Sequence, residues 1–351
     1  MSETAAKEAI REPLSVQIWR WLTSAAGVTI VLTIVIAIIA AIDAGPFILV
    51  NTVVTGGMWA LLSMGLSLVF GVMNIPNFAH GEFFLAGSFT AYFVFNPIRL
   101  YLQDNPNQLL SALAPFLGII AATIVGLILG FVLEVLVFRQ LRNRSREQWV
   151  MNSFLLTVGI SVVFVNAAQL IWGANFRGIP QYWDVEPLRF FNVNVSIDRL
   201  AALGLAVVAL SVFYYFMRRT QTGRAIRAVA QDETGAQMVG IDLNRILLLT
   251  LSLSGGLAAM AGASLLFIFP AYPSAGLRPL YVAWYVVILV GLGNVSAAVV
   301  GGFIVALLQT LTSFYIGPGW EDVIPTAIII VILIFKPSGL FGSEVKGVHE
   351  Q

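Results

Sequence analysis

A histidine and a carboxylate, His80 and Glu82, stand two residues apart in the string NFAHGE at residues 77–82. Such a pair has the groups that acid–base chemistry or a proton relay requires. No second titratable residue lies close in sequence to accept the proton, and the pair follows Pro76 in a stretch typical of a turn. We therefore predict a hydrogen-bonded polar turn at the end of a membrane span, and no catalytic residue.

Nucleotide and metal chemistry lack their usual residues. The only lysines are Lys7, Lys336 and Lys346, and none ends a G-x-x-x-x-G-K-[ST] phosphate-binding loop. The chain has no cysteine and only two histidines, His80 and His349, so a thiolate or histidine metal site is not expected. We predict that this chain binds no cofactor or metal and does not hydrolyse ATP by itself.

Amides are the polar groups that reach deepest into an apolar stretch. Asn166 and Gln169 lie three residues apart in the segment 149–172 and share one face of a helix there. Amides can bind a substrate by hydrogen bonds without exchanging protons. The alternative role is hydrogen bonding between helices, which stabilises membrane bundles. Both roles stay open, with Asn166 and Gln169 as candidate residues of a translocation path.

A polar segment, residues 217–245, separates two long apolar stretches and has the signals of a short helix. Asp232 can cap its N-terminus and Glu233 suits its first turn. Gly240 suits a left-handed stop at its C-terminus. Between them lie three apolar candidate contact residues, Ala236, Met238 and Val239.

The elements that position these residues are membrane spans. Of the 351 residues, 58% are hydrophobic and only 11% are charged, against about 25% charged in soluble proteins. The composition predicts an all-α, polytopic membrane protein, and a formal net charge of +1 argues against nucleic acid as a partner. We expect about ten transmembrane helices, near residues 21–42, 47–70, 82–95, 111–138, 149–172, 200–216, 246–269, two short crossings within 280–316, and 321–335.

Basic residues orient these spans. Fourteen of the 19 lysines and arginines fall on one side of the ten-span arrangement, mainly in the segments 139–146 and 217–245. Basic residues of short loops favour the cytoplasm, so we expect both termini to be cytoplasmic. The segment 280–316 is the weak point, because one crossing plus a re-entrant hairpin would change the parity. Glu134, close to a span end, is expected to pair with a loop arginine.

The same pattern predicts the domain organisation. Residues 1–20 form a cytoplasmic segment, and residues 21–42 form an extra N-terminal transmembrane helix, for which a cleaved signal peptide is the alternative. Residues 43–342 form the main membrane domain, and residues 343–351 form a cytoplasmic tail. A weak echo of Gly71 and Asn74 at Gly291 and Asn294 also suggests a duplicated helix-turn-helix unit.

Four strings carry a resemblance to a known family: NIPNFAHGEFFLAGSFTAY (74–92), the segment 222–263, VGLGNVSAAVVGG (290–302) and KPSGLFG (336–342). Together they resemble the integral permease of bacterial branched-chain amino-acid ABC importers, LivH type. The likeness runs from about Phe47 to the C-terminus. Its most distinctive string consists of Asn77, Phe78, Ala79, His80, Gly81 and Glu82.

The resemblance implies a subunit of an importer in the bacterial inner membrane. It implies a second permease subunit in a heterodimer, two ATP-binding subunits that use ATP and Mg²⁺, and a periplasmic substrate-binding protein. The loop 217–245 resembles the coupling loop that contacts the ATPases, which would include Asp232, Glu233, Ala236, Met238 and Gly240. The expected cargo is a neutral, branched-chain amino acid. The alternatives are urea or short amides with the same machine, and an ion-coupled secondary carrier.

Overall fold

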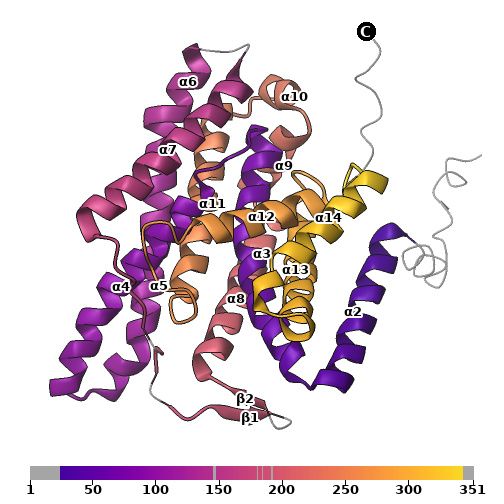
Figure 1. Ribbon diagram of the computed structural model, residues 1–351. Helices are drawn as coiled ribbons and strands as arrows, with labels where there is room; N and C mark the ends of the chain where they lie inside the picture. The colour runs from indigo at the N-terminus through magenta and orange to yellow at the C-terminus, as the bar shows by residue number, and fades with distance from the viewer. Residues whose placement is uncertain (1–23, 145–147, 180, 184, 191–192, 343–351) are drawn as a thin grey trace, which may run out of the picture.

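The computed structural model describes residues 24–144, 148–179, 181–183, 185–190 and 193–342. In this part the chain is mainly helical and its two named strands form one small hairpin, which confirms the all-α prediction (Figure 1). The predicted terminal segments 1–20 and 343–351 lie outside the described residues. The first half contains α2 (Ala25–Ala44), α3 (Phe47–Met73), α4 (His80–Asp104), α5 (Gln108–Leu133), the π-helix η1 (Glu134–Phe138), α6 (Arg139–Arg144) and α7 (Trp149–Trp172).

The second half begins with the hairpin, in which β1 (Leu188–Phe190) pairs antiparallel with β2 (Val193–Val195) and Arg189 lies opposite Asn194. The helices that follow are α8 (Ile197–Arg219), α9 (Gln221–Gln231), α10 (Glu233–Met238), α11 (Leu243–Ser264), α12 (Leu277–Val290), α13 (Val295–Tyr315), the 3-10 turn η2 (Pro318–Trp320) and α14 (Val323–Phe335). The hairpin and α10 lie at opposite ends of the bundle (Figure 1), and we call these the hairpin end and the α10 end.

Small polar residues start many of these helices. At each such start, a side-chain oxygen accepts a hydrogen bond from the backbone N–H of the first helical turn, which otherwise lacks a partner. The residues that cap in this way are Ser24, Asn107, Ser196, Thr220, Asp232, Asp242 and Asn294.

All ten predicted spans correspond to helices. Within the described residues, eight helical segments are long and apolar enough to cross a membrane. The other two are α4, which has His80 and Glu82 in its first turn, and α12, which has only 14 residues. The structure therefore confirms a polytopic helical membrane protein and shows that α12 is too short for a full crossing.

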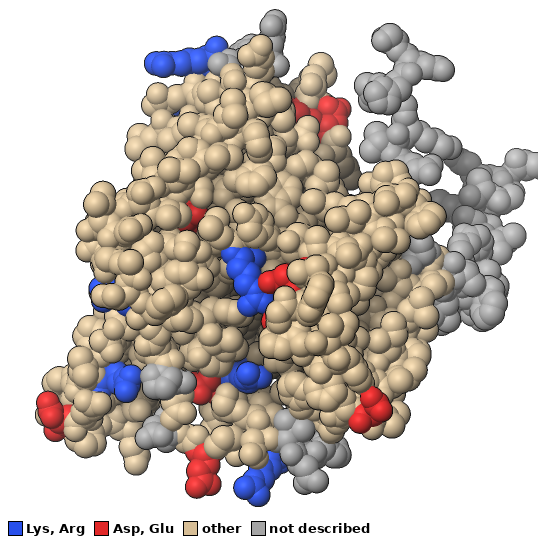
Figure 2. Space-filling view, viewed as in Figure 1, with Lys and Arg blue, Asp and Glu red and all other residues tan. Residues whose placement is uncertain are grey.

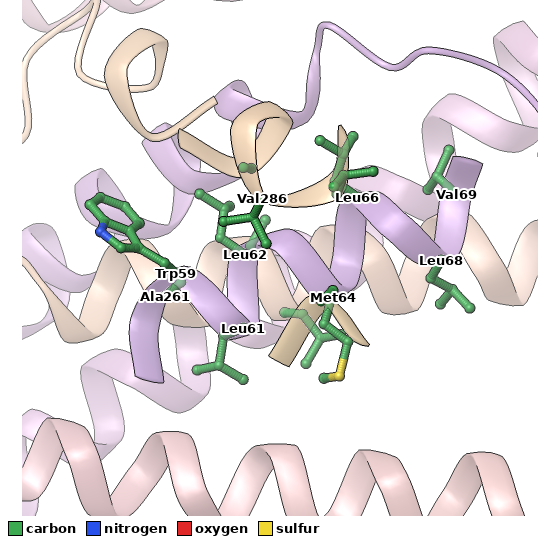
Figure 3. Close-up of a cluster of buried hydrophobic side chains, with 14 of the residues drawn as sticks. Trp59, Leu61, Leu62, Met64, Leu66, Leu68, Val69, Ala261 and Val286 are labelled. Carbon is green, nitrogen blue, oxygen red and sulfur yellow. The ribbon is translucent and has the colours of Figure 1, made fainter. Parts of the chain in front are cut away.

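Two helices, α3 and α11, form the centre of the bundle. In the 18-residue stretch that is most apolar, 83% of the residues of α3 and 78% of those of α11 are buried. The corresponding share is 11% in the segments that contain α2, α7 and α14. Side chains of α3 pack in opposite directions: Leu61 points to one side, whereas Leu62 points toward Val286 of α12 on the other (Figure 3). The outer helices instead expose apolar side chains, as expected of surfaces that face lipid.

The central bundle consists of two similar units in opposite orientation. In the first unit α3 runs toward the α10 end, α4 runs back and α5 follows it antiparallel. In the second unit α11, α12 and α13 do the same with the directions reversed. The pair α5 and α11 packs as closely as the pair α13 and α3. Inverted repeats of this kind are a common plan of membrane transporters.

Glycines permit both of these helix pairs to approach closely. A Cβ atom on Gly302 of α13 would lie 2.6 Å from the backbone nitrogen of Ala60 in α3, and one on Gly126 of α5 would lie 2.3 Å from the backbone oxygen of Gly255 in α11. Small residues at such contacts let backbones touch and gain van der Waals attraction.

The weak sequence similarity between residues 71–74 and 291–294 does not mark this repeat. Asn74 ends α3 in the left-handed conformation with φ 55°, whereas Asn294 starts α13 as an N-cap with φ −83°. These two residues therefore have different places in the two units. The repeated feature is the order of helices, which leaves little trace in an apolar sequence.

The predicted extra N-terminal helix is present as α2. It lies beside the bundle and joins it close to the hairpin end, where Ala40 packs with Ile48 of α3 and Leu307 of α13 (Figure 1). Asp43, near its C-terminus, accepts a hydrogen bond from the hydroxyl of Tyr315.

Candidate functional site

The polar segment 217–245 folds into α9, α10 and the start of α11. Asp232 caps α10, as its side chain accepts a hydrogen bond from the backbone nitrogen of Gly235 at 3.0 Å. Gly240 has φ +87°. Its N–H donates to the carbonyl of Gln237, and the next N–H, of Ile241, donates to the carbonyl of Ala236. This pair of bonds is a Schellman stop, so the predicted cap and left-handed stop are confirmed.

The apolar residues of α10 divide into two groups. Ala236 is buried in the core of this chain. Met238 and Val239 are 81% and 77% exposed. The preceding helix α9 buries Ile226 and exposes Arg224 on its other face. The open apolar surface at this end of the loop therefore consists of Met238 and Val239, held on a helix that is anchored at both ends.

The prediction that the string NFAHGE forms a turn at the end of a span is wrong. The segment 74–79 folds back along α3, so that Nε2 of His80 lies 2.9 Å from the carbonyl oxygen of Leu62. Leu62 is eleven residues before the end of α3, or about 16 Å along the helix axis. His80 and Glu82 thus lie inside the bundle, at the first turn of a helix that begins there.

Both ring nitrogens of His80 have a hydrogen-bond partner at this depth. Its side chain is fully buried. Its second ring nitrogen lies 3.3 Å from the hydroxyl of Ser254 in α11, so the ring joins α4 to both central helices. The neighbouring Asn77 accepts a hydrogen bond from the N–H of Ala79, and the ring of Phe78 stacks on Trp284 of α12 at 5.4 Å between centroids.

The buried carboxylate of Glu82 is only partly hydrogen-bonded within the described residues. It is 2% exposed. One carboxylate oxygen accepts a hydrogen bond of 2.7 Å from Ser161 of α7, and the other has no partner among the described residues. No second titratable side chain contacts it there. That this pair forms no proton relay stays a prediction.

Helices α4 and α12 begin at one point inside the bundle. Gly81, in the first turn of α4, packs against Gly276, which immediately precedes α12. From this point α4 runs to the hairpin end and α12 runs to the α10 end. A membrane helix that begins inside the bundle leaves free backbone N–H groups there, and transporters build substrate sites from helices interrupted in this way.

At the α10 end, two other strings of the resemblance contact each other. The N–H groups of Leu340 and Phe341 donate to the carbonyls of Leu289 and Val290, at the end of α12. The side chain of Asn294 donates to the carbonyl of Phe341. The strings 290–302 and 336–342 therefore close the end of α12 together, although they are far apart in sequence.

Asn166 and Gln169, the candidate path residues, lie on an exposed face of α7. The amide of Asn166 donates to the carbonyl of Val162 in its own helix. The role of these two amides in a path stays a prediction. The expected partner of Glu134 is confirmed as Arg142, at 3.0 Å.

The structure corrects the placement of one charged group. By the count of basic residues, Arg278 is one of the five that fall on the side of the ten-span arrangement opposite the basic loops. It is in fact the second residue of α12 and pairs with Glu321 and Asp322 at 3.2 and 2.8 Å. The sequence does hold a sign of this pairing, because Arg278, Glu321 and Asp322 flank the segment 280–316, whose number of crossings the sequence leaves open.

Comparison with known proteins gives a consistent answer. The family model described as the permease component of branched-chain amino acid transport systems matches residues 48–333. The high-affinity branched-chain amino acid transport system permease protein LivH of Salmonella typhimurium is 27% identical over 83% of this chain and 94% of its own length. The high-affinity branched-chain amino acid transport system permease protein BraD of Pseudomonas aeruginosa is 27% identical over 84% of this chain and 94% of its own length.

An archaeal relative extends the comparison. A probable branched-chain amino acid transport permease protein LivH of Methanocaldococcus jannaschii is 26% identical over 85% of this chain and 93% of its own length. No solved structure matches the chain. Since the family model covers most of the membrane domain, the chain belongs to the family of permease components of branched-chain amino acid transport systems.

Proposed function

We propose that this chain is one permease subunit of an ATP-driven importer that moves branched-chain amino acids into the cytoplasm. It would work with a second, non-identical permease subunit, two ATP-binding subunits and a periplasmic substrate-binding protein. The observation that supports this most directly is the apolar tip of α10 at the end of the bundle that is rich in arginine.

An exposed pair of apolar residues on a fixed helix suits a docking surface. Met238 and Val239 are more than three-quarters exposed, although α10 is held by the cap of Asp232 and the stop at Gly240. Exposed apolar groups that a fold holds rigidly often mark contacts with another protein. The ATP-binding subunits are the partner that fits, because the chain lacks a phosphate-binding loop and an importer needs a motor.

The position of α10 suits transmission of movement. It is joined through α9 to α8 and through the four residues 239–242 to α11, one of the two central helices. A displacement of α10 by closing ATPases would pull on α11, which touches His80 at the start of α4. Movement would then reach the point where the starts of α4 and α12 meet.

The cargo and location come from the family. The relatives are named for branched-chain amino acids, and the positive side of the bundle suits the cytoplasmic face of a bacterial inner membrane, with both termini inside. ATP and Mg²⁺ would bind to the partner subunits. Urea or a short amide would use the same machine, whereas an ion-coupled carrier would need no ATPase.

The test is co-purification together with uptake. Met238→Glu with Val239→Glu should lower recovery of the ATP-binding subunits with the permease at least tenfold and abolish ATP-dependent uptake of leucine. Leu188→Glu, an equally apolar-to-acidic change at the hairpin end, is the matched control and should have no effect. Normal recovery of the ATPases with the α10 variant would contradict the docking role. Calorimetry of leucine and urea with the binding protein would separate the two cargoes.

A further inference from the structure

Arg278 and two carboxylates form a charged cluster at the start of α12. The Nε atom of Arg278 donates to Asp322 at 2.8 Å, and its Nη2 atom lies 3.2 Å from Glu321. The guanidinium also lies over the ring of Phe269, at 5.6 Å from its centroid. The cluster joins α12 to the segment before α14, just beyond the point where the starts of α4 and α12 meet.

The depth of this cluster follows from its neighbours. Asp322 accepts a hydrogen bond from the amide of Gln309, and the same amide accepts one from the indole of Trp59. Gln309 is six residues before the end of α13 and Trp59 is twelve residues after the start of α3, or about 9 and 18 Å along these helices. The three charges therefore lie well inside a hydrocarbon core of about 30 Å.

The three charges are nevertheless open on one side. The side chains of Arg278, Glu321 and Asp322 are 38%, 32% and 37% exposed. Figure 2 shows basic and acidic side chains next to one another near the middle of this face, within a broad uncharged surface. A charge at the centre of a membrane helix costs about 2.5 to 3.5 kcal/mol when it faces lipid, so such groups face a partner, a cavity or a pathway.

The members of the cluster are used unequally. Asp322 employs both carboxylate oxygens, toward Arg278 and Gln309. Within the described part of the chain, Glu321 has a contact at one oxygen only, and the Nη1 atom of Arg278 has none. One N–H donor group of Arg278 and one carboxylate oxygen of Glu321 can thus still bind another group. The three residues together carry a net charge of −1.

This pattern complements the main chain of an amino acid. A zwitterion has a carboxylate that suits a guanidinium N–H donor, such as the free Nη1 of Arg278, and an ammonium that suits a carboxylate. The apolar surface needed for a branched side chain is adjacent, since Leu277 and Tyr281 lie one turn apart on α12 and Trp320 precedes Glu321; these three are 39%, 50% and 54% exposed.

We propose that Arg278 and Glu321 bind the carboxylate and the ammonium of the amino acid during its passage, with Asp322 as the residue that positions Arg278. This inference rests on the proposed function, because it assumes an α-amino acid as cargo. The site lies at the break that starts α12.

Two variants that keep the structural ion pair test this site. Arg278→Lys preserves a cation that can pair with Asp322 but loses the planar fork, and Glu321→Gln removes one charge while leaving Arg278 paired with Asp322. In vesicles that contain the complete complex, each should reduce leucine uptake at least tenfold, with the ATPases recovered normally and ATP hydrolysis still stimulated by the loaded binding protein. Asp43→Asn, an exposed carboxylate at the hairpin end, is the matched control.

Two results would overturn the inference. One is wild-type leucine uptake by both variants. The other is a loss of uptake that only follows a loss of assembled complex, since the cluster would then be structural. Uptake of leucine by the wild-type complex in the same vesicles tests the proposed cargo separately, and the ratio of variant to wild type tests the charged site.

Discussion

Gly81 and Gly276 face each other with no space for a methyl group between their backbones. A Cβ atom on Gly81 would lie 2.4 Å from the carbonyl oxygen of Gly276, and one on Gly276 would lie 2.2 Å from the carbonyl oxygen of Gly81. This contact joins the starts of α4 and α12, so the two helices can begin at one point only if both residues lack a side chain.

Gly81→Ala and Gly276→Ala should therefore each destabilise the permease by about 1 to 3 kcal/mol, the usual cost of overpacking. The expected result is a lower melting temperature in detergent and reduced leucine uptake. Gly159→Ala and Gly204→Ala are matched controls, because nothing lies within 4 Å of the Cβ position at either residue. Equal melting temperatures for all four variants would contradict the close contact.

His80 should prove to be structural. His80→Leu removes the partner of Ser254 and leaves that hydroxyl buried, which costs about 1 to 3 kcal/mol. We expect uptake to fall in proportion to the amount of folded permease, measured by membrane abundance and melting temperature. Ser254→Ala should cost less, and the double variant little more than His80→Leu. Loss of uptake at normal abundance would instead indicate a direct role in transport.

Gly240 should be sensitive to substitution because of its backbone conformation and not because of its neighbours. Its φ is +87° and nothing lies within 4 Å of its Cβ position. Gly240→Val is expected to cost on the order of 1 to 2 kcal/mol and to misalign α10, which uncouples ATP hydrolysis from uptake while leucine still binds to the binding protein. Gly240→Asn, which tolerates the left-handed region better, should retain much of the uptake. Substrate-stimulated hydrolysis and uptake at normal levels in the valine variant would exclude α10 as the coupling element.

Asn166→Leu combined with Gln169→Leu tests the predicted path on α7. Both residues are exposed and the Asn166 amide bonds within its own helix, so the change should leave abundance and assembly nearly normal while uptake falls. If abundance decreases together with uptake, the amides serve in packing against a partner.

The orientation can be checked with reporter fusions. A reporter after Arg144 or Thr234 should read cytoplasmic, and one after Glu186 should read periplasmic, because the α10 end carries most of the basic side chains. A cytoplasmic signal at Glu186 would reverse the assignment of the two ends.

Hydropathy was sufficient to find the helices, because long apolar runs such as 47–70 and 149–172 can be satisfied only as helices in lipid. It could not give the depth at which a helix starts. The segment 74–79 reads as a turn between spans, yet it returns along α3 until His80 meets Leu62. That return depends on glycine contacts such as Gly81 with Gly276, which involve residues almost 200 positions apart.

The local chemistry of α10 was predictable because caps and stops depend on neighbouring residues, such as Asp232 and Gly240. The cluster at Arg278 was not, since its partners Glu321 and Asp322 come from another part of the chain. Counting charges assigns a basic residue to one side or the other of the membrane. It has no category for an arginine that is held between the two sides.

The π-helix Glu134–Phe138 also has a geometric consequence. It widens one turn of the long helix formed by α5 and α6, and each residue of an α-helix corresponds to a rotation of about 100°. A π turn of this type accommodates one additional residue. Without that residue Arg142 would point about 100° away from its present direction, where its guanidinium reaches Glu134 and Asn244 at 3.0 and 2.8 Å. This single inserted residue thus sets the direction in which α6, with its arginines, leaves the membrane and contacts the start of α11.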